Sequence, residues 1–121
     1  NIKYKNFINV SEKKIIELYN MSFVLINPSL YEGFGLTNLE AQKMGVPVIT
    51  SNISPMKEIM RDSAILINPN DENEIYRNLN EIHSDKLLRN KIIIKGYKNI
   101  LEYDINFAKK KYFDLYKKIF D

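Results

Sequence analysis

Short apolar runs alternate along this chain with segments that have the periodicity of helices. The runs that read as strands are residues 7–10, 23–26, 47–50 and 64–67. Between and after them, apolar spacing and capping residues predict helices over residues 12–20, from about 36 to 44, and over 56–60, 72–83, a stretch beginning after Asp85, and 106–120. This alternation predicts an α/β fold, with a parallel sheet that carries helices on its faces and a chain that ends in helices.

The composition fits one domain and excludes several classes of protein. The 121 residues are 45% hydrophobic and 27% charged, so we predict a single domain over residues 1–121. No apolar run approaches the roughly 20 residues of a membrane-spanning helix. Cysteine is absent and His83 is the only histidine, which excludes a disulfide framework and a thiolate or histidine-cluster metal site. The lack of cysteine favours a reducing cytoplasm.

The net charge of +3 is concentrated near the end of the chain, in lysines 109, 110, 111, 117 and 118. Mild basicity is compatible with an anionic ligand, a nucleic acid or a lipid surface. No basic-and-aromatic recognition motif accompanies these lysines, so we do not expect nucleic-acid binding. The chain opens with Asn1 and has no initiator methionine or signal-peptide pattern, and we expect it to be a piece of a longer protein.

Residues 28–40 join the apolar run 23–26 to a predicted helix, at the sheet edge where parallel α/β folds bind ligands. Gly33 and Gly35 remove side chains where a ligand could approach the backbone, and the amides that open the helix lack intrahelical acceptors. Such a site suits phosphate. Glu32 precedes the helix and Glu40 lies one turn inside it. Carboxylates beside phosphate repel it, so both should face hydroxyl groups, which a nucleotide-linked sugar offers on either side of its phosphates.

Each of these residues also has an ordinary structural explanation. A pair of glycines is common in strand-to-helix turns, and an isolated Gly-x-Gly is a weak signal. Glu40 could be a solvated surface carboxylate, and Thr37 and Asn38 could be helix caps. The spaced Gly-x-Gly-x-x-Gly of a dinucleotide-binding oxidoreductase is absent.

The sequence of residues 28–41 taken as a whole favours a ligand site over these structural explanations. Residues 28–36 read PSLYEGFGL, and Leu39-Glu40-Ala41 follows, so that two glutamates are separated by seven residues. This string resembles the donor-site motif of the retaining glycosyltransferases with two Rossmann-like domains (the GT-B architecture), of the family 4, group 1 type. Residues 45–52, Glu58-Ile59 and Asn68-Pro69 also resemble that family. Asn38 departs from it, because many members carry an apolar residue there, and residues 42–44 are more polar than usual.

The resemblance implies a partial GT-B C-terminal domain, a Rossmann-like parallel sheet with flanking helices that binds a nucleotide-sugar donor. It implies that Glu32 is catalytic and contacts the donor sugar near the reacting carbon, that Glu40 holds the ribose hydroxyls, and that Val10 borders the base. The donor-binding residues implied in this way are Val10, Glu12, Gly33, Phe34, Gly35, Leu36, Thr37, Asn38 and Glu40.

The activity implied is transfer of a sugar, with retention, from a nucleotide-diphosphate sugar to a glycan or lipid-linked acceptor in polysaccharide biosynthesis, with no metal or cofactor. The family's phosphate-binding Arg and Lys and its N-terminal acceptor domain have no counterpart in this sequence, so we expect the chain alone to be inactive. The tail lysines leave open a peripheral contact with anionic lipid at the cytoplasmic face of a membrane. A non-catalytic nucleotide-sugar-binding or regulatory α/β module remains the alternative.

Overall fold

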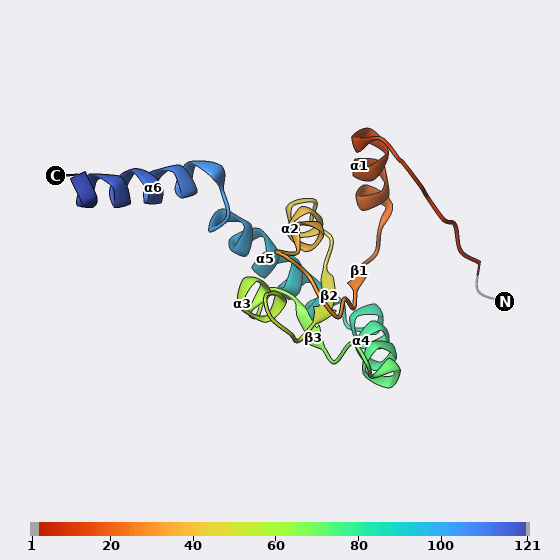
Figure 1. Ribbon diagram of the computed structural model, residues 1–121. Helices are drawn as coiled ribbons and strands as arrows, with labels where there is room; N and C mark the ends of the chain where they lie inside the picture. The colour runs from red at the N-terminus through yellow and green to blue at the C-terminus, as the bar shows by residue number, and fades with distance from the viewer. Residues whose placement is uncertain (1–2, 121) are drawn as a thin grey trace.

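A computed structural model describes residues 3–120. Along the chain it contains the helices and strands α1 (Glu12–Met21), β1 (Leu25–Asn27), α2 (Leu36–Lys43), β2 (Val48–Ser51), α3 (Met56–Met60), β3 (Ile65–Ile67), α4 (Glu72–Ser84), α5 (Lys86–Leu101) and α6 (Ile105–Phe120) (Figure 1). The predicted α/β fold that ends in helices is confirmed.

The three strands form one parallel sheet in the order β1-β2-β3. Asn27 pairs with Thr50 at the end of β1, and Ser51 pairs with Ile67 at the end of β2. The carboxyl ends of all three strands therefore lie at one edge of the sheet. The loops that follow the strands, including residues 28–35, start from this edge.

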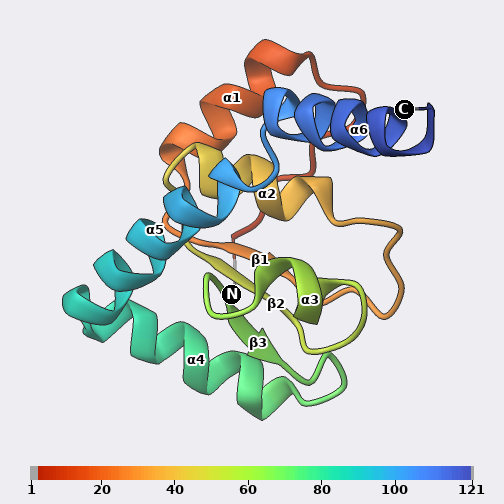
Figure 2. The same cartoon turned by 90° about the vertical axis from the view of Figure 1, so that its left-hand side faces the viewer.

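The sheet is covered on both faces (Figure 2). On one face, α2 and α3 pack against β2 and form a cluster that includes Leu39, Val48 and Met56. On the other face, Ile82 of α4 packs with Ile49 and Ile67. α5 packs mainly against α2. Parallel strands covered in this way need apolar residues on both faces, which explains their continuous apolar runs.

The predicted strand over residues 7–10 is wrong. These residues are irregular and do not join the sheet, and in Figure 1 they extend beyond α1, away from the three strands. Asn9 has a φ of 53°, which interrupts an extended conformation. The side chains of Phe7 and Ile8 are 44% and 74% exposed, so the apolar pattern here does not correspond to a buried strand.

The predicted helix ends follow from local chemistry. Ser11 caps α1, and Asp71 caps α4 by accepting from two backbone amides. Glu74, three residues after Asp71, does not complete a capping box, because its carboxylate accepts from the backbone N of Asn68 at 2.7 Å. Gly45 follows α2 with a φ of 72°, the left-handed conformation in which glycine commonly ends a helix.

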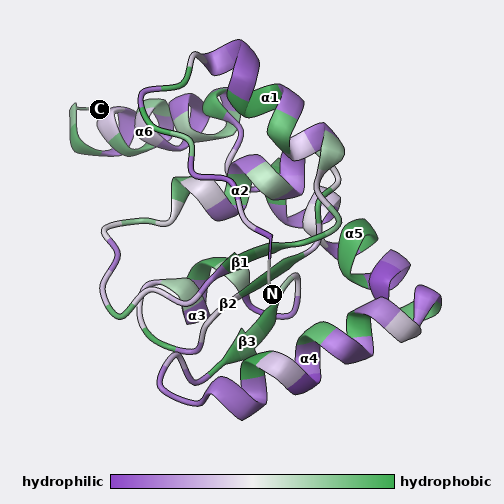
Figure 3. Ribbon diagram, turned by 90° about the vertical axis from the view of Figure 1, so that its right-hand side faces the viewer, coloured by the Kyte–Doolittle hydropathy of each residue, from purple (hydrophilic) through white to green (hydrophobic). Residues whose placement is uncertain are grey.

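Two helices are only weakly covered. α1 and α6 contain no buried residue. Figure 3 shows that α6 carries both hydrophobic and hydrophilic residues along its length. Between residues 3 and 120, no helix combines the length and the apolar character that crossing a membrane requires.

Candidate functional site

The candidate site is centred on the loop from β1 to α2, residues 28–35, at the carboxyl edge of the sheet. Gly35 ends this loop and occupies the N-cap position of α2, with a φ of 77°. An added Cβ there would lie 2.3 Å from Cε and 2.5 Å from Sδ of Met56 in α3. Gly35 therefore provides both a left-handed turn and the space in which α2 and α3 approach each other.

The first turn of α2 exposes backbone donors. Its N-cap provides no side-chain hydrogen bond, as expected for glycine. The backbone N atoms of Asn38 and Leu39 donate to the carbonyl oxygen of Gly35, at 3.0 and 3.4 Å. Within residues 3–120, no backbone hydrogen bond is donated by Leu36 or Thr37. These two amides, together with the positive end of the helix dipole, can bind an anion.

Glu32 is half-buried in the loop, and one of its two oxygens is held by neighbouring side chains. Oε1 accepts from Ser29 Oγ at 2.8 Å and from Asn27 Nδ2 at 3.3 Å. No donor to Oε2 is found within residues 3–120. The carboxylate is therefore oriented through one oxygen, while the other remains available to a ligand.

A buried polar network holds Asn27, a residue that donates to Glu32. Asn38 is fully buried, and its Oδ1 accepts from Asn27 Nδ2 at 3.1 Å. Its Nδ2 donates to Thr50 Oγ1 at 3.1 Å and lies 2.9 Å from the sulfur of Met56. Thr50 Oγ1 in turn donates to the carbonyl oxygen of Asn27 at 2.9 Å. Asn38 thus acts on the site through Asn27, and its buried side chain does not face a ligand.

Glu40 is exposed on α2 and is contacted by α1. The hydroxyl of Tyr19 donates to Glu40 Oε2 at 3.1 Å, and it also lies 3.3 Å from the carbonyl oxygen of Thr37. Burial, followed by the charge of Glu40 and the hydrogen bond to it, raises the pKa of Tyr19 to about 12. The phenol therefore remains protonated, and able to donate, at every ordinary pH.

The remaining predicted site residues differ in their contacts with the β1–α2 loop and α2. Gly33 is exposed, and the ring of Phe34 packs edge-on against Tyr103 with centroids 5.9 Å apart. Val10 and Glu12 lie at the start of α1, and in the part of the chain that the structure describes no hydrogen bond joins their side chains to residues 28–40. The strand expected to present them to the site is absent.

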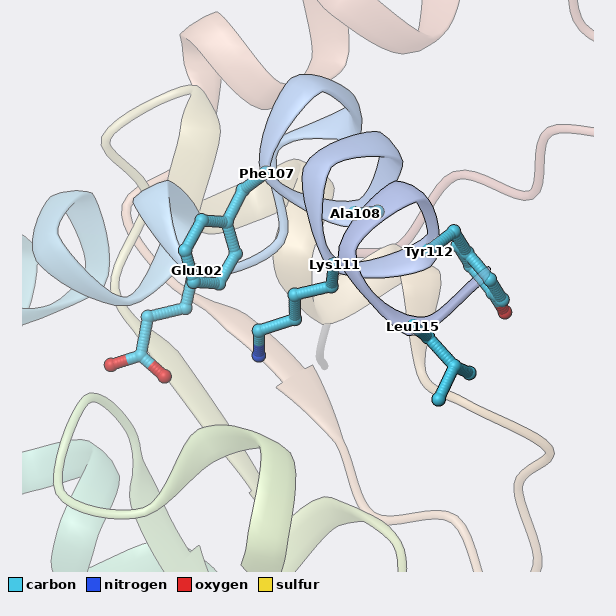
Figure 4. A pocket seen from close by; sticks show the side chains of 6 residues that line it. All are labelled: Glu102, Phe107, Ala108, Lys111, Tyr112 and Leu115. Atoms are coloured by element: carbon cyan, nitrogen blue, oxygen red, sulfur yellow. The ribbon is translucent and has the colours of Figure 1, made fainter. Parts of the chain in front are cut away.

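Two surface hollows differ in their relation to this site. One, of about 350 Å³, is lined by Leu36, Leu39, Glu40, Lys43, Ile100, Tyr103, Asp104 and Ile105, and so shares Leu36 and Glu40 with the predicted site. The other, of about 320 Å³, lies between the end of α5 and α6 and contains none of the predicted residues (Figure 4). Among residues 3–120, no group of three or more acidic, histidine or cysteine side chains is placed to hold a metal ion.

Sequence reasoning missed the residues that hold the two glutamates. Tyr19 lies in the predicted helix over residues 12–20, and the need of a partly buried phenol for a hydrogen-bond partner is a signal that the sequence offers. Asn27 and Ser29 stand at the end of a buried strand, where polar side chains of an α/β sheet often contribute to a site. Nothing in the sequence indicated that Thr50 would contact Asn38.

Comparisons with known proteins agree with this architecture. The family model described as "Glycosyl transferases group 1" matches residues 1–99. A similar fold is found in the crystal structure of the C-terminal domain of a glycosyl transferase group 1 family protein (LpcC) from Francisella tularensis. The match covers 84% of this chain and 53% of that chain, with a TM-score of 0.74 and 31% sequence identity. This similarity supports the GT-B-like fold.

Curated relatives match about three fifths of this chain. O-antigen chain mannosyltransferase B from Escherichia coli is 38% identical over 74 residues, which are 61% of this chain and 19% of that protein. Sucrose-phosphate synthase from Spinacia oleracea is 40% identical over 79 residues, 64% of this chain and 8% of that protein. The chain thus spans a fifth or less of the length of these two relatives. With a family model matched over most of its length, the chain belongs to the group 1 glycosyltransferases.

Proposed function

We propose that this chain forms the donor-binding part of a retaining glycosyltransferase that uses a nucleotide-diphosphate sugar. The observation that carries the proposal is a pair of carboxylates held by hydrogen bonds, Glu32 in the loop before α2 and Glu40 in the second turn of α2, whose N-terminus has no side-chain cap. The membership of the family and the names of its mannosyltransferase relatives support it.

The diphosphate of the donor would bind at the first turn of α2. The free amides of Leu36 and Thr37 supply donors there, and the glycine N-cap leaves the backbone accessible. A nucleotide bound in this way has a sugar on one side of the diphosphate and a ribose on the other. Each sugar then needs acceptors for its hydroxyls, which is the role of the two glutamates.

Glu32 would accept hydroxyls of the transferred sugar through Oε2, because Oε1 is already held by Ser29 and Asn27. A carboxylate fixed before the ligand arrives does not have to be ordered during the reaction. Glu40 would accept the ribose hydroxyls. Leu36 and Glu40 both line the hollow of about 350 Å³, which supplies space beside the ribose.

Transfer with retention would follow front-face attack by the acceptor hydroxyl. The bond from the anomeric carbon to the diphosphate oxygen breaks, the bond to the acceptor oxygen forms on the same face, and the departing diphosphate takes the acceptor's proton. No metal ion is included in this proposal. Acceptor binding and further cationic contacts to the diphosphate would come from parts outside residues 1–121, so the chain alone is expected to transfer little or no sugar. A glycan or lipid-linked acceptor in polysaccharide biosynthesis fits the printed name of the O-antigen relative.

The test uses the full-length protein that carries this chain. Binding of UDP, GDP, ADP and their sugars is measured by titration calorimetry for the parent, Glu40→Ala and Glu32→Gln, with Glu81→Gln on the exposed face of α4 as control. We expect Glu40→Ala to weaken binding about tenfold or more. We expect Glu32→Gln to bind nucleotide normally but to lower donor turnover by about a hundredfold, the scale of losing one preorganised contact.

Three results would count against the proposal. Unchanged nucleotide affinity in Glu40→Ala would remove the ribose assignment, and unchanged turnover in Glu32→Gln would remove the catalytic one. Tight nucleotide-sugar binding with no turnover by the full-length parent would instead favour a non-catalytic binding module.

A further inference from the structure

We infer that Tyr19 is a positioning residue for nucleotide binding, which holds Glu40 in the orientation that receives the ribose hydroxyls. The inference rests on the proposed function, because it concerns the partner of Glu40. Tyr19 extends the candidate site to α1. Within the described part of the chain, it is the only residue of α1 whose side chain forms hydrogen bonds with residues 28–40.

The geometry gives Tyr19 two anchoring points on α2. Its hydroxyl lies 3.1 Å from Glu40 Oε2 and 3.3 Å from the carbonyl oxygen of Thr37, one turn earlier. The phenol has one proton, so the two acceptors share it. Both contacts lie on the part of α2 that the donor would meet, between the free amides and Glu40.

The contact leaves Glu40 competent to bind a diol. Oε2 faces Tyr19, and among residues 3–120 no group donates to Oε1. A carboxylate has about four lone-pair positions, so Glu40 can accept two ribose hydroxyls while it retains Tyr19. Without Tyr19, an exposed glutamate on a helix samples several rotamers, and binding would have to select one of them.

Two further observations allow the contribution of the hydroxyl to be tested separately from that of the ring. The ring of Tyr19 packs beside the core cluster of α2 and α3, so the hydroxyl can be removed without losing that packing. The pKa of Tyr19, raised to about 12 by burial and by Glu40, keeps the hydroxyl protonated throughout the pH range of enzyme assays.

The decisive experiment compares ribose with a sugar that lacks the hydroxyls. Full-length parent and Tyr19→Phe are titrated with UDP, GDP and ADP and with the 2′,3′-dideoxy form of each. We expect Tyr19→Phe to weaken binding of the ribonucleotide about fivefold and to leave the dideoxy form unchanged. In the Glu40→Ala background, which removes the carboxylate that accepts from the Tyr19 hydroxyl, the same substitution should have no further effect.

Tyr76→Phe is the matched control, because Tyr76 is 67% exposed on α4, and its affinities should equal those of the parent. Equal weakening for ribose and dideoxy forms would make Tyr19 a structural residue only and overturn the inference. The inference would also be wrong if Glu40→Ala weakened binding while Tyr19→Phe did not, and in that case the proposed function would stand. If Glu40→Ala had no effect, both would fail.

Discussion

At Gly35 the chain turns into α2 with a left-handed backbone, directly against the end of the Met56 side chain. Gly35→Ala would combine the cost of a positive φ with displacement of a fully buried methionine. We expect it to lower the free energy of unfolding by about 2 kcal/mol. Urea unfolding followed by circular dichroism measures this loss.

Gly33→Ala is the paired control for that change, since an added Cβ there would have no atom within 4 Å. It should alter the free energy of unfolding by no more than about 0.5 kcal/mol. Equal losses of unfolding free energy in the two variants would show that neither the contact with Met56 nor the turn at Gly35 requires a glycine at position 35.

The raised pKa of Tyr19 makes the stability of the molecule depend on pH in the alkaline range. Its pKa is raised from 10.0 to about 12, so the stability contributed by its protonated form is complete below pH 10 and is lost as pH rises through about 12. An ultraviolet titration of phenolate should contain an ionisation step near pH 12 that Tyr19→Phe abolishes.

Glu40→Gln tests the cause of the late ionisation. It removes the charge and weakens the hydrogen bond, so the pKa of Tyr19 should fall toward 10.0. It should not reach that value, because burial is the largest cause of the shift. A titration identical to that of the parent would show that Glu40 does not contact the phenol in solution.

Among the elements, β1, β2, α2 and α3 meet at the side chain of Asn38, which is fully buried. Asn38→Asp keeps its shape and the oxygen that Asn27 contacts, but it places a carboxylate where the amide donated to Thr50. We expect a loss of roughly 3 kcal/mol of stability at neutral pH, because the buried charge has no cationic partner. Chemical denaturation at two pH values tests this expectation.

The loss in Asn38→Asp should shrink at acidic pH, where the neutral carboxyl can donate again. Asn90→Asp makes the same chemical change on the exposed surface of α5 and should alter stability by less than about 0.5 kcal/mol. If the two variants were equally stable, the network around Asn38 would not contribute to the fold.

The same elements explain how far sequence reasoning can go. The helices were predicted closely because capping residues and apolar spacing are local properties of the sequence. Strand formation also depends on a distant pairing partner, and residues 7–10 have none in the sheet although their composition suits a strand. The two glutamates and the glycine loop were predicted from the motif, whereas the contact of Tyr19 with Glu40 was not, because it joins residues 21 positions apart.

At the scale of the whole molecule, the helices and strands differ in how deeply their residues are buried. β2 lies between the other two strands and all four of its residues are buried. α1 and α6 bury no residue, and the apolar residues of α6 include Phe113, Tyr116 and Ile119, exposed by 69%, 59% and 62%. Residues 3–120 therefore combine a buried centre around β2 with two helices, α1 and α6, that are only weakly covered.

The central position of β2 has a consequence for deuterium uptake. Its amides can exchange only when the sheet itself opens, whereas those of α1 and α6 can exchange through local unfolding. Hydrogen-exchange mass spectrometry should therefore find fast labelling in peptides from α1 and α6 and the slowest in residues 48–51. Uniform labelling would contradict this order. Because Asn27 pairs with Thr50 in this slow centre and donates to Glu32, the backbone that orients Glu32 should belong to the last part of the molecule to unfold.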